Sequence, residues 1–238
     1  MIQNQLCGYC NVKLTKEENS QTCRSREHLI PNAALTQKRN YAEADFYVCR
    51  RCNLNKSRMD YIIGFIAKIQ ASDPDIALQA IANAKKKKLE NQRFEKMIDS
   101  TVFNGTNYEM TMPFTVNELD SYVLYLAKGL YFRTYKKTLN TTLFMVDFNL
   151  INKRMIDSIS SSYSMIHESD PIEDLKKNPN AELILKGECI LIQGEGGKRN
   201  YLIFFQNGFG LLINIVRRSH KNVKKKLDYL KTFSSFQS

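Results

Sequence analysis

Residues 7–10 read CGYC and residues 49–56 read CRRCNLNK, so the chain carries two Cys-x-x-Cys pairs. Each pair places two thiolates at the spacing of a zinc knuckle, and two knuckles together supply the four ligands of a tetrahedral Zn²⁺ site. Residues 11–48 separate the pairs, a longer insert than the roughly 15 to 20 residues of a simple zinc ribbon, so the insert should form structure of its own. We therefore expect a structural Zn²⁺ held by Cys7, Cys10, Cys49 and Cys52.

The other two cysteines, Cys23 and Cys189, are expected to be buried thiols, with Cys23 as an alternative spare zinc ligand. Six cysteines are too few for a disulfide scaffold in 238 residues, which favours a reducing compartment. The N-terminal residues lack the pattern of a secretory signal, and no apolar run approaches the roughly 18 residues of a membrane-spanning helix. We expect a cytoplasmic protein that does not cross a membrane.

Charge favours a polyanionic partner. The chain has 35 Lys and Arg against 24 Asp and Glu, a formal net charge of +11, with hydrophobic residues at 43%. The composition excludes a disordered chain. The net charge favours a polyanion, and the usual polyanions are nucleic acid and membranes. The basic residues gather in the N-terminal part, in the run at 85–88 and in the tail from Arg217, whereas 101–216 is slightly acidic.

The hydrophobic patterns predict an α+β protein. Apolar residues recur at helical spacing after Tyr61, in a second helix from Pro74 towards Met97, and over 115–137, where Thr115 and Glu118 have the capping-box spacing. Further along, the patterns predict a strand at 143–146, a helix at 151–166, and strands at 182–193, 200–206 and 209–216. The Asn207-Gly208 pair predicts a hairpin between the last two strands, which indicates an antiparallel sheet.

The insert contains the stretch SREHLIP at residues 25–31, and the second knuckle runs directly into Asn53 and Lys56. Cys-x-x-Cys, Glu-His-x-Ile-Pro and Cys-x-x-Cys-Asn-x-x-Lys, in that order, resemble the zinc-stapled branch of the HNH endonucleases over residues 5–60. The resemblance implies a ββα-metal module over 1–60. A helical connector would follow at 61–100, and an α+β domain of unknown role at 101–238.

The resemblance also implies roles for single residues. His28 would be the general base, and Glu27 and Asn53 would hold Mg²⁺ or Mn²⁺, since carboxylate and amide oxygens suit such ions. Lys56, Arg50 and Arg51 would contact phosphate, so these three residues are the candidates for nucleic-acid binding.

Several structural alternatives stay open. Glu27 could instead face solvent or pair with Arg26 or Arg24, and Asn53 could simply cap a helix, with Asn55 as its substitute. The middle Asn of the family, which orients the loop of the general base, has no counterpart before the second knuckle, where Asn40 or Asp45 could take its place.

The leading hypothesis is a metal-dependent endonuclease that hydrolyses DNA, by family analogy in antiphage defence or a mobile element. Residues 101–238 would then select the substrate, a protein partner or a second copy. One alternative is a catalytically inactive, zinc-dependent nucleic-acid-binding module. The other is a nuclease subunit activated by a partner ATPase or sensor.

Overall fold

A computed structural model of the chain describes residues 1–86, 92–103, 105, 108–195, 199–219, 221 and 225. The basic run at 85–88 and the basic tail lie largely outside these residues. Within the described part, α-helices accompany an antiparallel five-stranded sheet, so the predicted combination of helices with an antiparallel sheet is confirmed.

The N-terminal part consists of two short strands and a long helix. Strand β1 (Arg24–Glu27) pairs antiparallel with β2 (Phe46–Cys49), and α1 (Arg50–Ile69) follows β2 directly. Two 3₁₀ turns, η1 (Asn32–Ala34) and η2 (Tyr41–Glu43), lie between the strands. Because α1 begins inside the second knuckle, the helix predicted after Tyr61 is the second half of a longer one.

The middle of the chain is mostly helical. Within the helix predicted from Pro74 to Met97, the described residues form α2 (Pro74–Lys86) and α3 (Gln92–Asp99), and residues 87–91 lie outside the described part. The short strands β3 (Val102–Phe103) and β4 (Tyr108–Glu109) follow. Helix α4 (Val116–Tyr135) begins as predicted, since Thr115 accepts a hydrogen bond from the Glu118 amide and the Glu118 carboxylate accepts one from the Thr115 amide.

The large sheet has the strand order β5-β9-β8-β7-β6, with every neighbouring pair antiparallel. Its strands are β5 (Phe144–Ile151), β6 (Ala181–Ile184), β7 (Cys189–Gln193), β8 (Asn200–Phe205) and β9 (Phe209–Arg217). Helices α5 (Lys153–His167) and α6 (Pro171–Lys177) lie between β5 and β6. The single strand predicted over 182–193 is wrong: the 3₁₀ turn η3 (Leu185–Gly187), all of whose residues have positive φ, divides it into a hairpin.

The β8–β9 turn reaches the end of α1. Gln206 and Asn207 take φ values of 50° and 53°, so the left-handed residues lie one position earlier than the predicted Asn207-Gly208 pair. A Cβ atom at Gly208 would lie 1.5 Å from the Gln70 carbonyl oxygen. Glycine is therefore required there by the close approach of the turn to α1.

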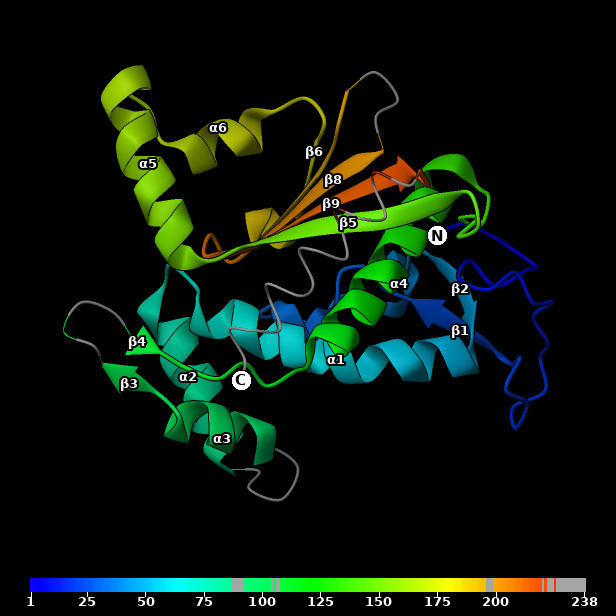
Figure 1. The fold of residues 1–238 in the computed structure, drawn as a ribbon. Coiled ribbons are helices and arrows are strands. Elements are labelled where there is room, and N and C mark those ends of the chain that lie inside the picture. The colour runs from blue at the N-terminus through cyan, green and yellow to red at the C-terminus, as the bar shows by residue number, and fades with distance from the viewer. Residues whose placement is uncertain are drawn as a thin grey trace.

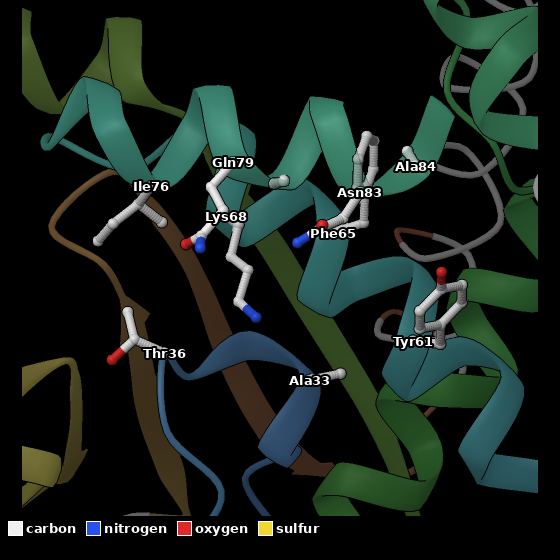
Figure 2. A pocket seen from close by; sticks show the side chains of 10 residues that line it. Ala33, Thr36, Tyr61, Phe65, Lys68, Ile76, Gln79, Asn83 and Ala84 are labelled. Atoms are coloured by element: carbon white, nitrogen blue, oxygen red, sulfur yellow. The ribbon is translucent and has the colours of Figure 1, made fainter. Parts of the chain in front are cut away.

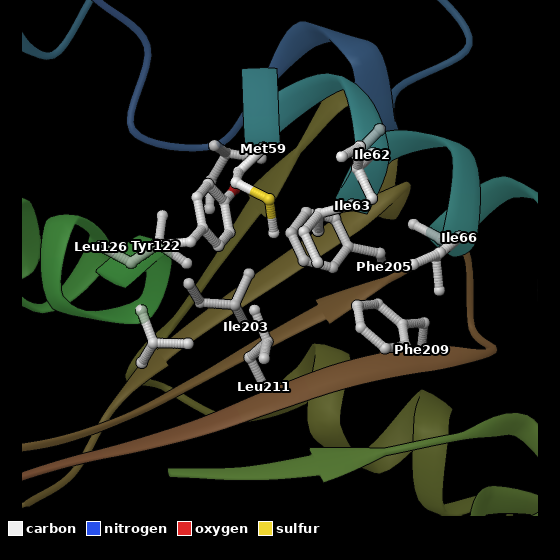
Figure 3. Close-up of a cluster of buried hydrophobic side chains, with 14 of the residues drawn as sticks. Met59, Ile62, Ile63, Ile66, Tyr122, Leu126, Ile203, Phe205, Phe209 and Leu211 are labelled. Atoms are coloured by element: carbon white, nitrogen blue, oxygen red, sulfur yellow. The ribbon is translucent and has the colours of Figure 1, made fainter. Parts of the chain in front are cut away.

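The sheet is covered on both faces, which gives three layers (Figure 1). Side chains of β8 alternate: Ile203 and Phe205 belong to the core that also contains α1 and α4 residues, whereas Phe204 packs with α5 and α6. Figure 3 shows Met59 and Ile63 of α1 lying over Ile203 and Phe205.

One cluster of buried side chains runs from Leu29 to Ile215. It includes residues from all three segments predicted as separate units, so in the structure 1–60 and 101–238 share a core through α1. No helix among the described residues has the length and apolar character needed to cross a membrane.

Candidate functional site

Four cysteine sulfurs gather where the N-terminal loop meets the start of α1. The Sγ atoms of Cys7, Cys10, Cys49 and Cys52 all lie within 4.8 Å of one another, and those of Cys10 and Cys49 are 3.8 Å apart. Tetrahedral zinc with Zn–S bonds of about 2.3 Å requires sulfurs about 3.8 Å apart. The donor set and its spacing therefore suit a structural Zn²⁺, as predicted.

The electrostatic surroundings differ among the cysteines of the cluster: burial raises the pKa of Cys49, and the hydrogen bond with Cys7 raises the pKa of Cys52. The Cys49 amide donates a hydrogen bond of 3.2 Å to the Cys7 sulfur, and a hydrogen bond from the Cys52 thiol lowers the pKa of Cys7 to about 5. Cys23 is only partly buried and lies outside the cluster, so the structure gives it no place as a spare ligand, whereas Cys189 is fully buried as expected.

His28 directly follows β1, and an aspartate fixes the backbone beside it. The Leu29 amide donates to Asp45 Oδ2 at 2.9 Å, and the Asp45 amide donates to the Glu27 carbonyl at 2.8 Å. Asp45 is therefore hydrogen-bonded to the backbone on both sides of His28. Asn40 instead caps η2.

The His28 imidazole is half-buried, and its Nδ1 atom is buried without a hydrogen-bond partner in the described part of the chain. Burial lowers its pKa from the ordinary 6.5, and the nearby Arg39 charge acts in the same direction. The ring is therefore neutral at pH 7, the form that accepts a proton.

Glu27 lies in an unexpected environment. It is 2% exposed, and its Oε1 atom lies 2.9 Å from the Nζ atom of Lys56, which is itself fully buried. Lys56 also contacts both carboxylate oxygens of Asp60 at 2.8 and 2.9 Å, and Tyr122 donates to Asp60 at 3.0 Å. Glu27 thus neither faces solvent nor pairs with Arg24 or Arg26.

This buried network, which we call the Lys56 network (Glu27, Lys56, Asp60 and Tyr122), changes the interpretation of two predicted residues. With no exposed surface, Lys56 is not placed to touch a phosphate. Glu27 has one oxygen taken by Lys56, while its Oε2 atom is buried without a partner of full hydrogen-bond geometry among the described residues; the Tyr9 hydroxyl lies near the same carboxylate and lowers its pKa. Burial raises the pKa of Glu27 to about 7, and Lys56 opposes that shift.

The remaining predicted residues lie on the first turns of α1. Asn53 donates from Nδ2 to Ser25 Oγ at 2.8 Å, so its amide reaches across to β1. Asn55 points to α4, where its amide lies 3.5 Å from the Tyr125 hydroxyl. Arg50 and Arg51 are exposed at the helix start, and Arg50 donates to the Glu18 carbonyl.

Sequence reasoning missed the partners of the Lys56 network. Tyr122 lies 62 positions from Asp60, and only the packing of α4 on α1 brings them together. The spacing of Lys56 and Asp60, four residues apart on one helix face, was the signal available in the sequence.

Comparisons with protein-family models, curated proteins and solved structures find no match for this chain. The likeness to the HNH endonucleases thus rests on the motif residues alone.

Proposed function

We propose that the chain is a metal-dependent endonuclease of the HNH type that hydrolyses phosphodiester bonds in DNA. One observation carries the proposal, namely the arrangement of the β1–β2 hairpin and α1. The four sulfurs tie the start of α1 to the N-terminal loop, His28 directly follows β1, and Asn53 on the first turn of α1 reaches β1 through Ser25.

In this proposal His28 is the general base. Its lowered pKa keeps the imidazole neutral at pH 7, so the ring can take a proton from a water molecule as that water attacks the phosphorus atom. Asp45 holds the Leu29 amide and so fixes the backbone next to the base. The exposed Arg50 and Arg51 are proposed to hold the DNA backbone at the start of α1.

The resemblance implies that a divalent ion, Mg²⁺ or Mn²⁺, binds with Glu27 and Asn53 as protein ligands. Since Lys56 takes Oε1, the buried Glu27 Oε2 atom is the oxygen proposed for such an ion, although the Tyr9 hydroxyl lies near the same carboxylate. When bound, a divalent cation stabilises negative charge on the phosphate and on the departing oxygen.

A plasmid-cleavage assay tests the proposal, using zinc-loaded protein in EDTA, Mg²⁺ or Mn²⁺. We expect cleavage only with Mg²⁺ or Mn²⁺, and a loss of at least about 100-fold in His28→Ala, as for removal of a general base. His167→Ala, at the exposed end of α5, is the matched control and should cut as the wild type does. Equal cleavage by His28→Ala would overturn the assigned role.

The Lys56 network favours a second candidate function, a zinc-dependent DNA-binding module without catalysis. Lys56 stands beside the carboxylate that the resemblance assigns to the metal, and an ammonium there competes with a divalent ion. Folded, zinc-loaded wild type that binds DNA but cuts none with either metal would favour this function over the nuclease.

A further inference from the structure

A pocket of about 450 Å³ lies between α1, α2 and the segment after η1 (Figure 2). Its volume falls in the range of roughly 300 to 1,000 Å³ that is typical of small-molecule sites. Helix α1 contributes Tyr61, Phe65 and Lys68 to its wall, and α2 contributes Gln79 and Asn83 among others. The function proposed above uses none of these residues.

Among the described residues that line the pocket, Lys68 alone is charged. It is half-buried, and Figure 2 shows its side chain extending into the space between α2 and the segment that carries Ala33 and Thr36. Over the described residues its ammonium has neither an ion pair nor a hydrogen bond. Burial lowers the pKa of Lys68, as expected for a cation partly removed from water.

The carboxylate that acts on Lys68 is already engaged elsewhere. Glu188 opposes the lowering of the Lys68 pKa, but its Oε2 atom accepts hydrogen bonds from the Thr36 amide at 2.7 Å and from the Gln206 side chain at 3.3 Å. The Thr36 hydroxyl donates to its other oxygen. These donors are neutral, so Glu188 keeps its charge, but among the described residues it forms no ion pair with Lys68. The partly desolvated Lys68 ammonium is therefore available to an anionic ligand.

The rest of the wall combines aromatic rings with amides. Phe65 stacks on Phe94 with ring centroids 4.0 Å apart, and Tyr61 packs against the same Phe94 ring at 5.4 Å, so the aromatic side is fixed by packing. Gln79 and Asn83 lie four residues apart on one face of α2 and offer amide donors and acceptors. Such a wall suits a flat ring with polar edges.

We propose that this pocket binds a nucleoside monophosphate, with the phosphate at Lys68 and the base between the aromatic rings and the two amides. Free mononucleotides and the phosphorylated end of a DNA strand both present a phosphate next to a base. The proposal does not depend on cleavage. Lys68 lies 15 residues beyond Asn53 on α1, which is about 22 Å along the helix at 1.5 Å per residue.

Isothermal titration calorimetry on the full zinc-loaded chain tests the proposal with AMP, GMP, CMP and UMP, and with adenosine and inorganic phosphate as partial ligands. We expect at least one monophosphate to bind at least ten-fold more tightly than either partial ligand. Lys68→Met, which keeps the length of the side chain, should weaken that binding at least ten-fold. Gln79→Trp should block the pocket from an exposed position, and exposed Lys38→Met should bind normally.

Competition by a 5′-phosphorylated oligonucleotide would assign the ligand to a strand end, and binding without competition would assign it to the free nucleotide pool. Unchanged affinity in Lys68→Met, phosphate binding as tight as the nucleotide, or no binding by any of the four would overturn the proposal. His28→Ala should bind as the wild type does, so failure of the nuclease proposal and failure of this one are distinguishable.

Discussion

Lys56 has no exposed surface, and its buried ammonium contacts the carboxylates of Glu27 and Asp60. Removing one partner of a buried ion pair leaves an uncompensated charge and costs about 3–5 kcal/mol. We therefore expect Lys56→Met to lower the free energy of unfolding by about 3–5 kcal/mol in urea titrations. Exposed Lys13→Met should stay within about 0.5 kcal/mol of the wild type.

The double variant Glu27→Gln with Lys56→Met removes both charges of one contact and should recover part of the loss, because neighbouring sites are not additive. If Lys56 instead served to contact phosphate, Lys56→Met would weaken DNA binding and leave the stability unchanged. That outcome would contradict the structure of the Lys56 network.

For single residues, the sequence indicated the four cysteines that could hold zinc but not the environment of Glu27. Each Cys-x-x-Cys pair is local, so its geometry follows from spacing alone. The partner of Glu27 lies 29 positions away on α1, and its burial depends on Tyr122 of α4 as well. Such a contact arises only when three elements pack together, which no short motif encodes.

An ion pair between Arg93 and Glu118 connects α3 with α4. Arg93 Nη1 lies 3.0 Å from both Glu118 oxygens and lowers the pKa of Glu118 below its ordinary 4.5. A lowered pKa in the fold means that the stabilisation is present above pH 4.5 and is lost as the pH falls through the folded pKa. Because the Arg93 side chain is 40% exposed, the pair contributes less than about 1 kcal/mol.

Glu118→Gln keeps a side-chain oxygen for the Thr115 amide but removes the charge. We expect it to be less stable than the wild type at pH 7, by less than about 1 kcal/mol, with the difference shrinking as the pH falls below 4.5. Thermal unfolding from pH 3 to 7 measures this, with exposed Glu195→Gln as the control. A difference that is constant with pH would show that the charge plays no part.

Elements with local signals were predicted well, and those set by backbone strain were not. The Thr115–Glu118 spacing marked the start of α4, and the antiparallel β8–β9 pair followed from alternation and a turn signal. The break in the predicted strand 182–193 depends on positive φ at Leu185 and Lys186, residue types that rarely adopt it. In the sequence of this segment, Gly187 was the one residue of a type that is typical of a turn.

On the scale of the whole molecule, the four-cysteine region packs against the rest of the chain. Cys7, Cys49 and Cys52 share a hydrophobic cluster with Phe46 of β2 and Phe132 of α4. Leu29 and Ile30, which follow β1, belong to the main core. The N-terminal residues therefore pack against the body that contains the large sheet. Loss of zinc should affect that body and not only residues 1–60.

We expect zinc removal by a chelator, or Cys49→Ser, to lower the melting temperature of the entire chain in a single transition. Metal-binding free energy is folding free energy when the unfolded chain has no preformed site, and a shared core makes the segments unfold together. Amide hydrogen exchange, followed by mass spectrometry of peptides from β5 to β9, reports the sheet, and a chromogenic chelator reports zinc release, so the two signals should coincide. Cys23→Ser, outside the four-sulfur cluster, should retain zinc and the wild-type melting temperature. Two separate transitions, with the sheet signal unmoved by chelation, would show that residues 1–60 unfold independently despite the shared core.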